Sequence, residues 1–137
     1  MSTHIKTRYV PISGTAAGLG LTAGGGTLVV DRPRGRARGQ GLGHDGGDLL
    51  SAALGGCFWN DLHYVADAAG VDVDIDAVEA EIELAGNPPR VVRAHVRARL
   101  SGAPQDVQQQ IFDAAAESST IANSLTGAFE TIFERLQ

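Results

Sequence analysis

Cysteine is almost absent from this chain of 137 residues, which contains only Cys57. A single cysteine excludes an internal disulfide and any metal site built on paired cysteines. The histidines show no spacing typical of metal ligands; they are His4, His44, His63 and His95. We therefore predict a chain that binds no metal and needs no cofactor.

Long apolar runs and an excess of basic residues are missing as well. No apolar run reaches the roughly 18 residues of a membrane-spanning helix, and the first residues lack the apolar core of a signal peptide. The net charge of −5 argues against general nucleic-acid binding. We expect a cytoplasmic protein with no membrane and no nucleic-acid partner.

The longest helical pattern of the sequence covers residues 46–70. Apolar residues recur there at spacings of three and four, Asp45 is placed to cap the start, and Gly70 to end it. The apolar residues cover more of the helix circumference than one small sheet can bury, so we expect the helix to contact more than one neighbour. Gly55 and Gly56 each cost about 1 kcal/mol in mid-helix. They predict a close crossing of another backbone beside Cys57.

The remaining patterns predict an α+β domain with antiparallel sheets. We expect a β meander over 1–31, a β hairpin over 74–102 and helices over 104–126. The tail, 127–137, has the periodicity of a helix but residue types that favour a strand. In the hairpin, alternation predicts a charged face and an apolar face. The predicted pairs are Glu79 with Arg97, Glu81 with His95, Glu83 with Arg93, Ile82 with Ala94 and Leu84 with Val92.

A loop from Asp31 to His44 places four arginines at alternate positions, Arg32, Arg34, Arg36 and Arg38. One interpretation is a solvated, mobile basic loop. The other is that one arginine folds over the start of the long helix toward Cys57. A thiol in mid-helix gains nothing from the helix N-terminus, so a nearby cation is what would favour its thiolate.

The segment Gly46–Phe58, GGDLLSAALGGCF, resembles the central helix of the OsmC/Ohr family of osmotically inducible and organic hydroperoxide resistance proteins. The stretch 70–73, the charged hairpin and the stretch 120–125 are similar too, so the resemblance runs from Thr27 onward. It implies a single OsmC-like domain over 1–137, with sheets wrapped around the long central helix. It also implies a strand at the tail and an intertwined homodimer.

The resemblance further implies thiol peroxidase chemistry, because Cys57 matches the family's cysteine that attacks a hydroperoxide. The second, resolving cysteine falls at Ser119, and the glutamate that supports the thiolate falls at Gly47, next to Asp48. The stretch 13–31 lacks the family's arginine. Candidate supports are thus the four loop arginines with Asp48, Tyr64 and His44. Asp61, four residues after Cys57, would disfavour a thiolate.

Two functions stay open at this point. In the first, the protein is a one-cysteine, thiol-dependent peroxidase that reduces organic hydroperoxides, and an external thiol reduces the Cys57 sulfenic acid. In the second, it is a non-peroxidatic OsmC-like homodimer that binds a small metabolite in a pocket at the dimer interface. Cys57 then packs as a small hydrophobe, as free cysteines commonly do.

Overall fold

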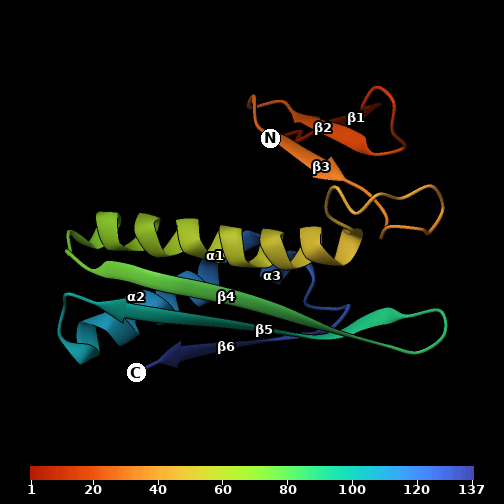
Figure 1. Ribbon diagram of the computed structural model, residues 1–137. Coiled ribbons are helices and arrows are strands. Elements are labelled where there is room, and N and C mark those ends of the chain that lie inside the picture. Colours follow the sequence, from red (N-terminus) through yellow and green to blue (C-terminus); the bar gives the residue numbers. More distant parts are fainter. The chain divides into compact units, whose positions relative to one another are not determined.

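The computed structural model describes every residue from Met1 to Gln137. The chain divides into two compact units, Met1–Leu49 and Leu50–Gln137. Each unit contains one three-stranded sheet (Figure 1). The fold is therefore α+β, with strands and helices segregated along the sequence.

The first unit is a β meander followed by a long loop. Its strands are β1 (Thr7–Pro11), β2 (Gly18–Thr22) and β3 (Thr27–Val30), and each pairs antiparallel with the next. The loop returns to the end of β3, where the Asp31 amide donates to the His44 carbonyl oxygen. The unit ends in the first residues of helix α1 (Gly46–Ala69).

The start of α1 is capped by two carboxylates that act reciprocally. Asp45 Oδ1 accepts the Asp48 amide at 2.8 Å, and Asp48 Oδ2 accepts the Asp45 amide at 3.1 Å. This is the arrangement of a capping box, which satisfies amides that a helix N-terminus leaves open. The predicted cap is confirmed. At the other end, Gly70 adopts a φ of +65°, as a left-handed helix stop requires.

The second unit packs helices on one face of a sheet. The sheet consists of β4 (Asp74–Ala85), β5 (Arg90–Ser101) and β6 (Glu130–Leu136), with β5 in the centre. Helices α2 (Gln105–Ser118) and α3 (Thr120–Ser124) connect β5 to β6. In Figure 1, the length of α1 beyond Leu49 runs along this sheet. The tail is a strand, as the family resemblance implies, and the helical alternative from its periodicity is wrong.

The core of the second unit is formed by side chains from α1, α2 and β5. Phe58 of α1 is fully buried, and its ring meets Phe112 edge-on at 5.2 Å and Phe133 at 5.0 Å between centroids. Alternate residues of β5 face the same core, namely Ala94, Val96, Ala98 and Leu100. The opposite face carries charged pairs, such as Glu83 with Arg93 at 2.9 Å.

None of the helices combines the length and the apolar character that a membrane-spanning segment requires.

The hairpin register agrees with the predicted pairs except at the turn. Glu79, Glu81, Ile82 and Glu83 have the predicted partners on β5. Leu84, however, pairs with Val91, because a register shift after Glu83 leaves Val92 as an extra residue on β5. The predicted pair of Leu84 with Val92 is therefore wrong. The prediction of antiparallel sheets holds for β1–β2–β3 and for β4–β5, whereas β6 runs parallel to β5 because α2 and α3 carry the chain across.

The two mid-helix glycines of α1 have different surroundings. A Cβ on Gly55 would lie 3.1 Å from the Ala80 Cβ on β4, so α1 and β4 approach closely there. A Cβ on Gly56 would meet nothing within 4 Å. The predicted close crossing is confirmed at Gly55, and within this chain it is wrong at Gly56.

Candidate functional site

The thiol of Cys57 lies at the edge of the buried face of α1, directly before the core residue Phe58. Its side chain is partly buried. The Sγ lies 3.5 Å from Asp61 Oδ2, one helical turn further on, and donates its proton to that carboxylate. The i,i+4 spacing that the sequence shows thus brings the carboxylate of Asp61 to the thiol, where it accepts a hydrogen bond.

Ser119 contacts the same sulfur from the other side. It is the single residue between α2 and α3, is only 1% exposed, and its Oγ donates to Cys57 Sγ at 3.8 Å. This is the only hydrogen bond of the Ser119 hydroxyl. A buried hydroxyl without a partner is costly, so the sulfur is what satisfies it. Cys57 Sγ therefore has an acceptor on one side and a donor on the other.

Other residues of α1 that could contact the thiol do not. Tyr64 is 72% exposed and makes no hydrogen bond to Cys57. His63 instead packs against Trp59, with ring centroids 5.4 Å apart. Both residues lie on a different face of α1 from Cys57. Within the unit Leu50–Gln137, the polar partners of the sulfur are Asp61 and Ser119.

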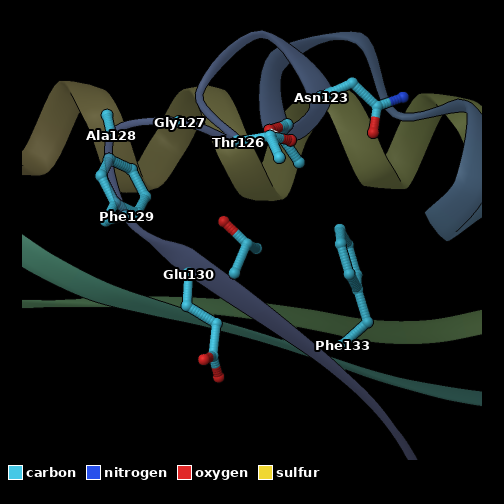
Figure 2. Close-up of a pocket in the computed structure, with 9 residues that line it drawn as sticks. Asn123, Thr126, Gly127, Ala128, Phe129, Glu130 and Phe133 are labelled. Carbon is cyan, nitrogen blue, oxygen red and sulfur yellow. The ribbon is translucent and has the colours of Figure 1, made fainter.

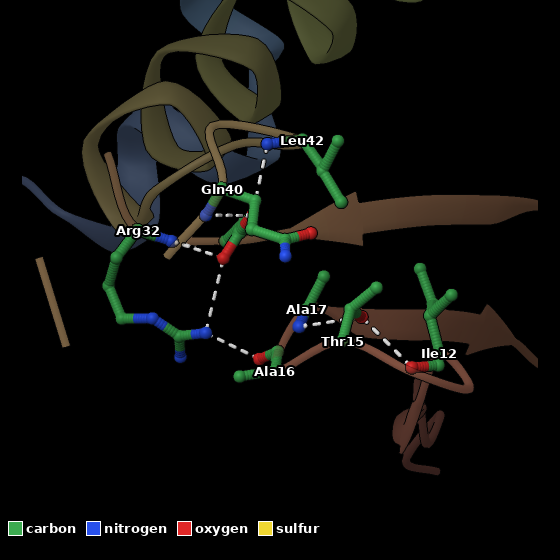
Figure 3. A network of polar contacts seen from close by, with 8 residues as sticks. Ile12, Thr15, Ala16, Ala17, Arg32, Gln40 and Leu42 are labelled. Carbon is green, nitrogen blue, oxygen red and sulfur yellow. Dashed lines mark hydrogen bonds and ion pairs between the residues drawn. The ribbon is translucent and has the colours of Figure 1, made fainter. Parts of the chain in front are cut away.

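The arginine loop is organised around the buried carboxylate of Asp31. Its oxygens accept the backbone amides of Arg32, Gln40 and Leu42, at 2.8, 3.1 and 3.0 Å (Figure 3). The guanidinium of Arg32 contacts the same carboxylate at 3.1 Å and also donates to the Ala16 carbonyl oxygen. Sequence reasoning missed this role of Asp31. An acidic residue at a strand end, followed by a glycine-rich loop, is the signal that points to it.

These contacts shift the titration of Asp31. Donation from the Leu42 amide lowers the pKa of the carboxyl against the opposing effect of burial, and the Gln40 and Arg32 amides and the Arg32 charge lower it further. The side chains of Arg34, Arg36 and Arg38 are exposed and make no ion pair. Of the four arginines, only Arg32 has a side chain held by an ion pair and a hydrogen bond in its unit.

Two other predicted supports occupy the start of α1. Asp48 belongs to the helix cap described above, and its Oδ2 lies 3.9 Å from His44 Nδ1. Both side chains are exposed. An orienting role of Asp48 or His44 at the thiol stays a prediction, as does a role of any loop arginine.

A cavity of about 480 Å³ lies between α3 and the start of β6. Phe129 and Phe133 stand at two sides of it, whereas the carboxylate of Glu130 points away (Figure 2). Ala122, Asn123 and Thr126 contribute polar and small groups from α3 and the turn that follows it. The sequence did not predict this cavity. Its wall combines the end of α3 with the start of β6, and the residue pattern of that tail fitted a helix as well as a strand.

Comparisons with known proteins agree on the fold. The family model described as OsmC-like protein matches residues 39–134. Among solved structures, an organic hydroperoxide resistance protein from Legionella pneumophila has a TM-score of 0.75 at 18% identity, over 98% of each chain. OhrB of Bacillus subtilis has a TM-score of 0.70 at 17% identity, also over 98% of each chain. A search of curated proteins finds no significant match.

A third similar structure is an organic hydroperoxide resistance protein from Elizabethkingia anophelis. It has a TM-score of 0.74 at 18% identity, over 98% of this chain and 96% of that one. At such identities, the agreement concerns the fold.

Proposed function

The chain belongs to the OsmC-like protein family, and on that premise we propose that it is a one-cysteine, thiol-dependent peroxidase acting on organic hydroperoxides. The observation that carries the proposal is a partly buried thiol on α1 with both an acceptor and a donor on its sulfur. A thiol kept only for packing needs neither. The names of the similar structures, organic hydroperoxide resistance proteins, support this substrate class.

The proposed reaction begins with attack of Cys57 Sγ on the terminal oxygen of the hydroperoxide. The O–O bond breaks, an alcohol leaves, and Cys57 becomes a sulfenic acid. The chain has no second cysteine, so no internal disulfide forms. An external thiol condenses with the sulfenic acid and releases water, and a second external thiol then regenerates Cys57.

We propose that the working form is a homodimer. Apolar and small residues remain exposed on α1, including Ala53, Gly56 and Trp59, the last at 39% exposure. Tyr64 on the same helix is 72% exposed. A second copy of the chain is the occupant that would bury them, and light scattering at micromolar concentration should give twice the chain mass of 14.2 kDa. A monomeric mass would contradict the proposal.

The decisive experiment for the activity is intact-mass spectrometry after mild treatment with cumene hydroperoxide. We expect the chain to gain one oxygen, and dimedone to trap it at Cys57 as a sulfenic acid. Cys57→Ser should gain none. Added small thiol should remove the oxygen from the wild-type chain. A wild-type chain that gains no oxygen, under conditions that oxidise a control peroxidase, would overturn the proposal.

One observation favours the second candidate, a non-peroxidatic protein that binds a small metabolite. The sulfur faces the carboxylate of Asp61, whose charge opposes a thiolate, and no cation contacts it within its unit. In that case Cys57 only lines or supports a pocket. The mass experiment separates the two functions, because only the peroxidase takes up oxygen.

A further inference from the structure

The two polar contacts on Cys57 Sγ differ in direction, because Asp61 accepts from the sulfur and Ser119 donates to it. We propose that Asp61 is the general base that accepts the Cys57 proton, and that Ser119 is the donor that stabilises the sulfur as charge builds on it. This inference rests on the proposed peroxidase function. It assigns the roles that an arginine and a glutamate hold in the family to residues of α1 and of the α2–α3 junction.

The geometry suits proton transfer from sulfur to carboxylate. Asp61 Oδ2 lies 3.5 Å from Sγ, and the thiol already donates to it. Asp61 is only partly buried, so water still reaches its carboxylate. A base must be within hydrogen-bond reach of the proton it takes, and this one is.

Proton transfer also removes the repulsion that Asp61 otherwise exerts on a thiolate. Before transfer the pair consists of a neutral thiol and a carboxylate, and after it of a thiolate and a neutral acid. The net charge of the pair is −1 in both forms. The protonated Asp61 then donates to the sulfur, so the two groups attract in either form.

Ser119 is buried beside the sulfur, and its hydroxyl is held in position as a donor. At 1% exposure its hydroxyl has no access to bulk water, and its only hydrogen bond is to Sγ. A donor aimed at an atom that gains negative charge stabilises the charged form more than the neutral one. Because the hydroxyl is already oriented, it needs no rearrangement when the sulfur reacts.

In the proposed step, the Sγ–H bond breaks and the proton passes to Asp61 Oδ2. The Sγ lone pair forms a bond to the terminal peroxide oxygen, the O–O bond breaks, and the leaving alkoxide takes the proton from Asp61. The products are the Cys57 sulfenic acid and an alcohol. The sulfur is oxidised by two electrons and the hydroperoxide is reduced by two, so no further reactant is needed.

The test compares Asp61→Asn with wild-type protein by rates of sulfenic acid formation with cumene hydroperoxide between pH 5 and 9. General acid–base groups contribute on the order of 10²–10⁴-fold, so we expect the variant to be slower at neutral pH by on the order of 10²-fold. The gap should close as the pH rises, because hydroxide then removes the proton. Asp61→Glu should restore part of the rate. Asp67→Asn, the same charge change further along α1, should keep the wild-type rate.

If Asp61 acts only through its negative charge, then Asp61→Asn reacts faster than wild type at neutral pH, and the inference is wrong. A slower rate with the same gap at every pH would point to a structural role and would also overturn it. Circular dichroism of each variant identifies a loss of folding. Ser119→Ala should slow the reaction by about fivefold, the worth of one net hydrogen bond.

A parallel arm uses iodoacetamide as electrophile and keeps this inference separate from the proposed function. Alkylation also needs the thiol proton removed, so the same order of rates is expected. If the wild-type chain takes no oxygen, the peroxidase proposal fails, and the alkylation rates still decide whether Asp61 accepts the proton. If wild type and Asp61→Asn oxidise equally fast, the peroxidase stands and only the role of Asp61 fails.

Discussion

In the unit Leu50–Gln137, twelve apolar residues form one buried cluster around Phe58 and β5. In the unit Met1–Leu49, the buried side chains are those of Ala17 and Asp31. The unit Leu50–Gln137 is stabilised by apolar area removed from water, and the unit Met1–Leu49 by directed hydrogen bonds to a carboxylate. A small meander with glycine-rich strands has little apolar surface to bury. The carboxylate of Asp31 instead fixes the loop after β3 through its hydrogen bonds. The two units should therefore respond to different perturbations.

The largest effect is expected from breaking the apolar cluster. Phe58→Ala removes a fully buried ring that contacts two other rings. We expect a loss of about 3–5 kcal/mol in the free energy of unfolding, measured by urea denaturation. Leu84→Ala, in the same unit but 52% exposed on β4, is the control and should cost much less. Equal losses would show that the buried cluster does not dominate the stability of its unit.

A cross-link can be introduced into the same unit. Ser119→Cys places a second thiol where the hydroxyl now lies 3.8 Å from Cys57 Sγ. We expect an oxidised form with no free thiol and a gain of about 2–4 kcal/mol, provided that the Cα atoms lie within about 7 Å. Thiol titration and non-reducing mass analysis detect the bond. Amide exchange around Asp31 should not change, and a change there would mean that the units are not independent.

The two glycines of α1 test how close its packing is. Gly55→Leu forces a side chain against Ala80 on β4, so we expect a loss of about 1–3 kcal/mol from overpacking. Gly56→Leu meets no atom of this chain, and the unit should keep its stability. If the second copy of the proposed homodimer covers Gly56, light scattering will instead show a lower mass. Equal melting of both variants and wild type would show that the approach of α1 to β4 is not tight.

The smallest effect is expected in the first unit and depends on pH. Because the folded-state pKa of Asp31 is lowered, its contribution to stability is present above the ordinary aspartate pKa of about 3.9 and is lost as the pH falls through the lowered value. Hydrogen exchange at the Gln40 and Leu42 amides should accelerate there, while the core amides of β5 stay protected. Asp31→Asn should show the faster exchange already at neutral pH. Unchanged protection of Gln40 and Leu42 in that variant would contradict the role of Asp31.

The features that could be predicted from the sequence are those with a local cause. Alternation determines the partners of Glu79, Glu81 and Glu83, because a slip of one residue would turn every side chain to the wrong face. The spacing of Cys57 and Asp61 places them one helical turn apart. The bulge at Val92 could not be predicted from alternation, since it depends on how the turn closes. No local pattern predicts the contact of Ser119 with the thiol, because the two residues are far apart in the sequence. Only the family resemblance related the two positions.

That separation has a consequence for the order of folding. Ser119 meets Cys57 across 62 residues, and between them the chain must complete the hairpin and α2. Contacts of such long range form late, because closing a long loop is entropically costly before other contacts compensate. During synthesis, α1 is finished well before the serine that completes its thiol site. A nascent chain therefore carries Cys57 without its hydroxyl partner, and the chemistry proposed for the sulfur becomes available only once the last third of the protein has folded onto it.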